Sequence, residues 1–252
     1  GGFGLELGRP ADQEVFVGLE SAADSSFELL PFCGPAKAKA AVGVDDFGRS
    51  VGEVGRSYRF FDDRVIRREL DVATDTWTAG DLEFSIHTPV LSLPEPGEGE
   101  TVGLKRACAP CVTATLRIDN RKGEGPRRFF FGIREGGGPR ALRRFYDDPE
   151  QRTMRGIAYG PDYGFATDTE GVHAGQGFSL DEVLDQQDLA ATHYGLGRVG
   201  LLVGKAPAGS VFEARLVFCF HREGRATTGV DTRYLYNRFF PDLETVAAYS
   251  LS

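Results

Sequence analysis

Short runs of β-forming residues, separated by turn residues, recur along this 252-residue chain. The clearest run is 212–220, where apolar side chains occupy every second position and would share one face of a strand. Residues 207–209, Pro-Ala-Gly, supply a turn immediately before it. Strands of this kind, spaced by short turns and with few helical stretches, predict a mostly β fold, an antiparallel β-sandwich with a few short helices.

Other runs have the same character and are expected to be strands. They cover residues 13–19, 65–72, 81–87, 112–118, 128–133, 164–167 and 198–203. The segment 74–80 is more polar and is predicted to be a turn-rich link that joins 65–72 and 81–87 into a hairpin.

Three helical segments are expected, each after a residue that can cap a helix. They are 180–189 after Ser179, 234–239 after Asp231, and a segment that begins after Asp242 and continues to the end of the chain. Ser179 and Glu182 have the spacing of a capping box. Because the chain shows neither an internal repeat nor a break in composition, we expect one domain over residues 1–252.

Both ends of the chain suggest a segment of a longer protein. The first residues, Gly1 to Gly4, contain neither Met nor the basic-then-apolar pattern of a secretion signal. The last expected helix still continues at Ser252. We therefore expect the natural N-terminus to be missing and the original protein to extend further.

The charge and hydropathy of the chain exclude several classes of partner. A net charge of −8 is unfavourable for binding nucleic acid or an anionic membrane surface. No apolar run approaches the roughly 18 residues of a membrane-spanning helix. The segments in which arginines adjoin aromatic residues, 127–131 and 233–240, are therefore interpreted as a core strand and a packed helix.

The cysteines and histidines do not predict a metal site. Four cysteines are too few for a disulfide scaffold, which favours a reducing cytoplasm. Cys108 and Cys111 have the CxxC spacing of redox and zinc motifs, but a β run follows them and no His lies nearby. We interpret them as ordinary thiols. The four histidines are scattered without the spacing of metal ligands.

Two further motifs each allow a functional and a structural interpretation. Residues 195–200 match the GxGxxG pattern of dinucleotide sites, but no helix follows, so a Gly-rich start of a strand is favoured. Asp147 and Asp148 follow Arg143 and Arg144 closely, which indicates a polar interface or loop network. The alternative is a catalytic carboxylate pair, whose separation the sequence cannot show.

Trp77 is the sole tryptophan, and it falls in the expected turn at 74–80. Its indole face would be able to stack on a sugar ring, which makes it a candidate substrate-binding residue. The alternative is that the ring fills a seam at the edge of the domain, and we favour this seam.

Several segments, in family order and over nearly the whole chain, resemble the N-terminal part of glycoside hydrolase family 52, the bacterial β-xylosidases. The most distinctive match is 72–82, Val-Ala-Thr-Asp-Thr-Trp-Thr-Ala-Gly-Asp-Leu. The other matching segments are 5–10 with 15–21, 143–144 with 147–148, 170–172 with 178–179, 194–200, and 234–240.

The resemblance implies an N-terminal, supersandwich-like β-sandwich joined to a C-terminal (α/α)6 catalytic barrel, which is absent from this chain. It implies a retaining, exo-acting hydrolase that releases xylose from short β-1,4-xylo-oligosaccharides. It also implies a cytoplasmic homodimer without a cofactor. The nucleophile and the acid/base of the family lie in the barrel, so no residue of this chain receives a catalytic role.

We therefore expect a structural domain that packs on the barrel and shapes the rim of its pocket or the dimer, with Arg143, Arg144, Asp147 and Asp148 near that interface. One alternative is a module that binds xylan chains through Trp77. A third, less favoured alternative is a hydrolase that needs no other domain, with its acids among Asp147, Asp148, Asp168 and Glu170.

Overall fold

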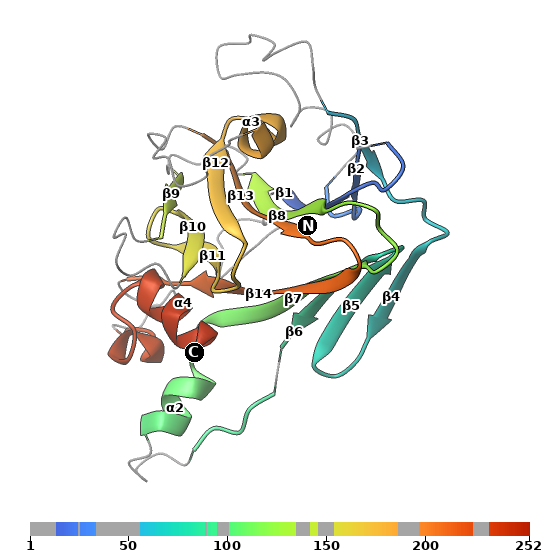
Figure 1. The fold of residues 1–252 in the computed structure, drawn as a ribbon. Coiled ribbons are helices and arrows are strands. Elements are labelled where there is room, and N and C mark those ends of the chain that lie inside the picture. The colour runs from blue at the N-terminus through green and yellow to red at the C-terminus, as the bar shows by residue number, and fades with distance from the viewer. Residues whose placement is uncertain are drawn as a thin grey trace.

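The structure, a computed structural model, describes residues 14–24, 26–33, 56–88, 90–94, 101–134, 142–145, 154–185, 197–223 and 232–252. Within these parts strands dominate, and the helices are few and short. Two sheets pack together around a shared apolar core, which confirms the predicted β-sandwich (Figure 1). None of the helices in the described parts has the length and apolarity needed to cross a bilayer.

The first sheet has six strands, and every neighbouring pair is antiparallel except the last, β2–β3, which is parallel. Their spatial order is β12 (His173–Gly177), β13 (Val199–Ala206), β8 (Arg127–Arg134), β1 (Glu14–Glu20), β2 (Phe27–Leu29) and β3 (Tyr58–Phe60). The three central strands, β13, β8 and β1, match runs predicted from the sequence. The three outer strands were not predicted.

The second sheet has eight strands, all antiparallel to their neighbours. Their spatial order is β4 (Ile66–Leu70), β5 (Thr74–Ala79), β6 (Leu82–His87), β7 (Cys111–Asn120), β14 (Ser210–Phe220), β11 (Tyr163–Thr167), β10 (Arg155–Tyr159) and β9 (Leu142–Arg144). Here β4, β6, β7, β14 and β11 were predicted, whereas β5, β10 and β9 were not.

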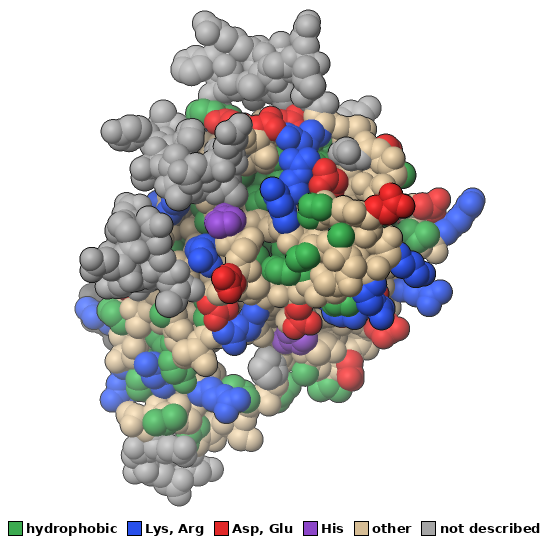
Figure 2. Space-filling model, in the orientation of Figure 1, with side chains coloured by type: hydrophobic (Ala, Val, Ile, Leu, Met, Phe, Trp, Pro, Cys, Tyr) green, Lys and Arg blue, Asp and Glu red, His purple; other side chains and the backbone are tan. Residues whose placement is uncertain are grey.

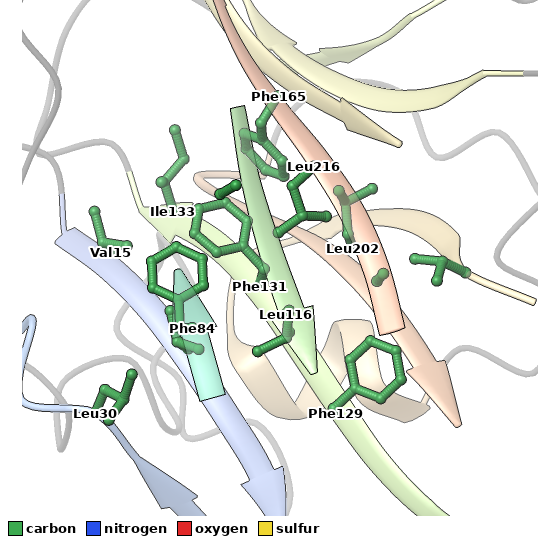
Figure 3. Close-up of a cluster of buried hydrophobic side chains, with 14 of the residues drawn as sticks. Val15, Leu30, Phe84, Leu116, Phe129, Phe131, Ile133, Phe165, Leu202 and Leu216 are labelled. Carbon is green, nitrogen blue, oxygen red and sulfur yellow. The ribbon is translucent and has the colours of Figure 1, made fainter. Parts of the chain in front are cut away.

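The core between the sheets is built around Phe131 of β8 (Figure 3). Its ring lies 5.8 Å from that of Phe84, 5.3 Å from that of Phe165 and 5.0 Å from that of Phe218, measured between centroids. These three partners come from three strands of the eight-stranded sheet. The alternation predicted for 212–220 is confirmed, because Ala214, together with Leu216 and Phe218, faces this core.

Each sheet also buries part of its outer face under a helix. Helix α3 (Leu180–Asp185) covers the outer face of the six-stranded sheet, where Phe130 is completely buried. Helix α4 (Leu243–Leu251) covers the outer face of the other sheet around Val217. Burial on both faces explains why β8 has three consecutive phenylalanines rather than an alternating pattern.

The helix α2 (Thr101–Ala107) projects away from the sandwich and contains no buried residue (Figure 1). It contacts α4 through Lys105, whose Nζ lies 4.5 Å from the centroid of the Tyr249 ring. The contact is a cation–π interaction. This helix was not predicted, because a seven-residue segment without an apolar face has no sequence pattern to reveal it.

The predicted link at 74–80 was wrong, because residues Thr74–Ala79 form strand β5. The hairpin expected between 65–72 and 81–87 is a three-stranded meander, in which β5 pairs with both β4 and β6. Threonine and tryptophan favour strands, and the tight turn is supplied by Gly80, whose φ is 58°, with Asp81. The polar residues of 74–79 were mistaken for turn residues.

The helices were predicted with mixed success. The α4 helix begins after Asp242 as expected, and α3 follows Ser179, whose Oγ accepts a hydrogen bond from Glu182 N at 3.2 Å. The expected helix at 234–239 is only the 3₁₀ turn Leu235–Arg238. Asp231 and residues 186–189 lie outside the described residues.

Candidate functional site

Trp77 lies in the middle of β5, between Arg68 of β4 and Phe84 of β6 in the strand register. The Phe32 ring meets it edge-on, with centroids 5.0 Å apart, and the Arg68 guanidinium lies 4.9 Å from its ring centroid. Arg68 is held in place by two hydrogen bonds of 2.8 Å to Asp75. The half-buried indole therefore packs against the main core, as the seam interpretation requires, while a role in sugar stacking stays a prediction.

Arg143 joins the edge strand β9 to helix α4. Its Nη1 forms an ion pair with Glu244, and its Nε donates to the carbonyl oxygen of Gly160 at 3.0 Å. Arg144 follows on the same strand, while Asp147 and Asp148 lie outside the described residues. The expected interdomain role of these four residues stays a prediction. The bond to Glu244 was not foreseen, because nothing in the local sequence connects the two positions.

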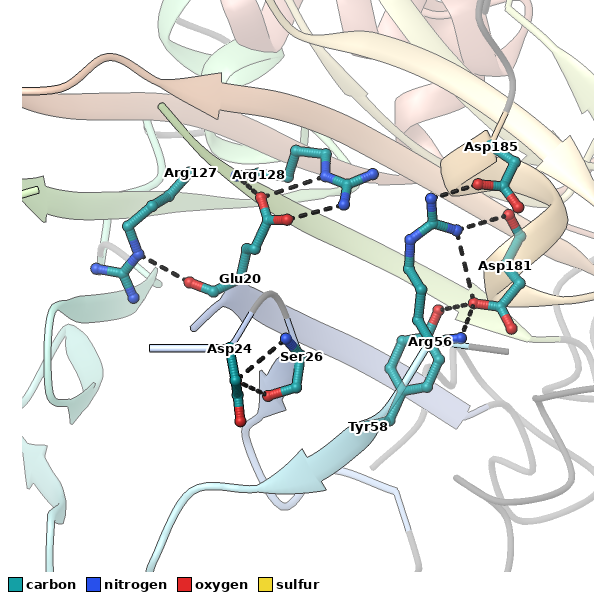
Figure 4. A network of polar contacts seen from close by, with 9 residues as sticks. All are labelled: Glu20, Asp24, Ser26, Arg56, Tyr58, Arg127, Arg128, Asp181 and Asp185. Carbon is teal, nitrogen blue, oxygen red and sulfur yellow. Dashed lines mark hydrogen bonds and ion pairs between the residues drawn. The ribbon is translucent and has the colours of Figure 1, made fainter. Parts of the chain in front are cut away.

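A polar network connects strand ends of the two sheets (Figure 4). Glu20 of β1 accepts hydrogen bonds from Arg128 N at 2.9 Å and from Arg128 Nη2 at 2.8 Å. Arg127 donates to the carbonyl oxygen of Glu20 at 2.8 Å and to Asp81, in the β5–β6 turn, at 2.6 Å. Burial raises the pKa of Glu20, but the hydrogen bonds and charge of Arg128 outweigh it and leave that pKa below its usual value.

The same network continues to helix α3 (Figure 4). Tyr58 donates from its hydroxyl to Asp181 at 2.6 Å, and Arg56 forms ion pairs with Asp181 and Asp185. Burial, followed by the bond to Asp181, raises the pKa of Tyr58. These bonds attach the short strand β3 to α3, which explains how an edge strand of three residues is held.

Several of the described carboxylates form ion pairs with arginines. A retaining glycosidase needs a nucleophile about 5 Å from an acid whose pKa is raised. Every described carboxyl whose pKa departs from its usual value has that pKa lowered. They are Glu20, Asp24, Asp75 and Asp119. Of the acids considered for a hydrolase without a barrel, Asp168 forms an ion pair with Arg215.

The surroundings of the CxxC cysteines and of the glycines in the 195–200 motif fit structural roles. Burial raises the pKa of Cys108 and of Cys111, which weakens both as nucleophiles. Within the described residues no group of three or more His, Cys, Asp or Glu is arranged to hold a metal ion. Gly197 of the 195–200 motif precedes strand β13 and Gly200 lies within it, so a strand rather than a helix follows the motif, as the structural interpretation predicted.

Two sheets around one core, in which all strand pairs but β2–β3 are antiparallel, define the chain as a β-sandwich. The family model described as Glycosyl hydrolase family 52 matches residues 1–252, and the chain therefore belongs to this family. Two curated relatives, both β-xylosidases of Geobacillus stearothermophilus, align with the chain. The first is 37% identical over 253 residues, which cover 100% of this chain and 36% of that protein. The second is 30% identical over 266 residues, which cover 100% of this chain and 42% of that protein.

Proposed function

We propose that this chain is the non-catalytic N-terminal β-sandwich domain of a retaining exo-β-1,4-xylosidase that releases xylose from xylo-oligosaccharides. The relatives that support this are named β-xylosidases, and the chain spans less than half of the length of each. The observation that carries the non-catalytic role is that Glu20, Asp181 and Asp185, described acids of the network, are held in ion pairs by arginines. An acid held in this way is unsuited to protonate a glycosidic oxygen.

In this proposal the domain packs against a C-terminal (α/α)6 catalytic barrel in the cytoplasm and shapes the rim of the substrate pocket. The exposed apolar side chains near α2 suit such packing, because large exposed apolar residues favour protein contacts. They include Leu93, which is 68% exposed, and Val102, which is 74% exposed. The barrel supplies both carboxylates of the reaction, so the sandwich acts through position and shape.

The test is hydrolysis of a chromogenic aryl β-xyloside by the purified 252-residue chain. A longer form, which also spans the remaining length of the relatives, serves as the positive control. We expect turnover only from the longer form. Turnover by the short chain would contradict the proposal and would direct a scan of Asp147, Asp148, Asp168 and Glu170.

The alternative role, as a module that binds xylan chains, is tested through Trp77. Because the ring is covered by Phe32 and Arg68, we expect no measurable xylo-oligosaccharide affinity by calorimetry in the wild-type chain. We also expect Trp77→Ala to lower stability, and Trp77→Phe to retain most of it. Sugar binding that Trp77→Ala abolishes, with the fold intact, would support the binding module instead.

A further inference from the structure

Cys111 and Cys219 lie directly opposite one another where strand β7 begins and strand β14 approaches its end. Both thiols are free. Cys219 is completely buried and Cys111 is half-buried, and both belong to the apolar cluster that α4 covers (Figure 1). The fold therefore gives Cys111 a neighbouring thiol that its CxxC motif does not contain.

The hydrogen bonds of the ladder show that this pair is of the non-hydrogen-bonded kind. Phe220 N donates to the carbonyl oxygen of Pro110 at 2.9 Å, so the adjoining pair is hydrogen-bonded. Because the two kinds alternate along an antiparallel ladder, Cys111 and Cys219 form the closer kind, with Cα atoms about 4.5 Å apart. A disulfide needs Cα atoms between about 4.4 and 6.8 Å apart. The backbone at this pair is therefore already spaced for a disulfide.

The side chains favour Cys219 over Cys108 as the partner of Cys111. Residues directly opposite in an antiparallel pair direct their side chains to the same face of the sheet. Burial, and then the nearby Cys111, raise the pKa of the Cys219 thiol, as expected for two thiols in close proximity. The Cys108 thiol donates to the carbonyl oxygen of Lys105, 3.7 Å away in its own helical turn.

We propose that Cys111 and Cys219 are a redox modification site, at which a hydroperoxide converts the two thiols into a reversible disulfide beneath α4. The Cys111 sulfur attacks a peroxide oxygen, the O–O bond breaks, and a sulfenic acid and one water are formed. The Cys219 sulfur then attacks the sulfenic sulfur, the S–S bond forms, and a second water leaves with the thiol proton. Two thiols and one hydrogen peroxide thus give one disulfide and two waters, with two electrons passing from sulfur to oxygen.

The half-buried Cys111 is the thiol that the oxidant meets first. The oxidant arrives from the surface over α2 and α4, where hydrophobic side chains lie among Lys and Arg (Figure 2). Burial raises the pKa of the Cys111 thiol, although a hydrogen bond with Ser250 of α4 partly opposes this. Because the thiolate is the reactive form, we expect slow oxidation at neutral pH and faster oxidation as the pH rises.

The test is oxidation of the purified protein with hydrogen peroxide, followed by thiol titration in denaturant. We expect the four thiols to fall to two, and dithiothreitol to restore all four. After digestion with trypsin, mass spectrometry should find the peptide 107–117 linked to the peptide 216–222. A bridge between Cys108 and Cys111 would lie within 107–117 and would overturn the proposal.

Cysteine variants identify the partners. Cys111→Ala and Cys219→Ala should each keep their three remaining thiols under the same treatment. Cys108→Ala and Cys33→Ala are matched controls and should each fall from three thiols to one, since Cys33 lies in the separate cluster beneath α3. Circular dichroism checks that every variant is folded, and the peptide map of the wild type does not depend on any variant.

Three other results would also overturn the proposal. The first is a wild type that keeps all four thiols in peroxide at every pH at which it stays folded. The second is a loss of thiols that dithiothreitol does not reverse. The third is a disulfide that joins two chains, which electrophoresis without reductant would reveal.

Discussion

At the scale of single residues, Gly132 and Gly125 differ in the space that their surroundings leave for a side chain. A Cβ at Gly132 of β8 would lie 2.1 Å from the carbonyl oxygen of Gly200 and 2.4 Å from Leu201 Cδ2. A Cβ at Gly125, in the β7–β8 turn, would meet nothing within 4 Å. Only the first position requires glycine for the close approach of another strand, because backbone atoms cannot move aside as a flexible side chain can.

We expect Gly132→Ala to lower the free energy of unfolding by about 3 kcal/mol, since the added methyl overpacks two strands. Gly125→Ala is the control and should change it by less than about 0.5 kcal/mol. Urea denaturation measures both. If both variants lost the same free energy of unfolding, close packing at Gly132 would not be the cause of the loss.

At the scale of elements, α4 shows how a local cap and a buried face work together. Asp242 accepts a hydrogen bond from Thr245 N at 2.7 Å, which satisfies one of the free N–H groups at the start of the helix. The face that includes Leu243 and Val246 is buried against β14 and its neighbours. Arg143 adds a bond from β9 to Glu244.

Asp242→Ala should lower the free energy of unfolding by about 1 kcal/mol, because it leaves that N–H group without its cap. Asp242→Asn keeps an acceptor at the same position and should retain most of the stability. Urea denaturation again provides the comparison. If the Asn variant were as unstable as the Ala variant, the charge of Asp242 rather than its hydrogen bond would be responsible.

At the scale of the whole molecule, both sheets depend on one core. Phe131 of the six-stranded sheet contacts phenylalanines on three strands of the eight-stranded sheet. The Arg127–Asp81 ion pair adds a polar link between the same sheets. Neither sheet can therefore keep its inner face buried when the other unfolds.

We expect the two sheets to unfold in one cooperative transition. Fluorescence of Trp77, which reports on β5, should coincide with far-UV circular dichroism, which reports on all strands. Phe131→Ala should shift both curves equally, with a loss of about 3–5 kcal/mol. Two separated transitions would instead indicate that the sheets are independent units.

Prediction from sequence succeeded where the pattern was local. The alternation in β14 and the cap at Asp242 each involve neighbouring residues, and both are confirmed. Strand β5 was missed because its polar residues, among them Asp75, were taken for turn residues, although threonine favours strands. Strand β12, His-Ala-Gly-Gln-Gly, has little strand propensity, and its pairing with β13 determines its conformation.

The contacts of the candidate site were harder to predict, because they join residues that lie far apart in the sequence. Glu244 lies 101 residues from Arg143, so no local pattern connects them. The packing of Phe32 and Arg68 against Trp77 could not be predicted from the sequence either.

The amino-acid sequence by itself therefore determined the family, the β-sandwich class, the central strands and the capped helix. Only the tertiary structure decided which strands are neighbours, which acids pair with arginines and which of the described strands lie at the edges of the sheets. The physical reason is that periodicity and capping arise between residues close in sequence. Strand partners, burial and charge pairing arise between residues that only the folded chain brings together.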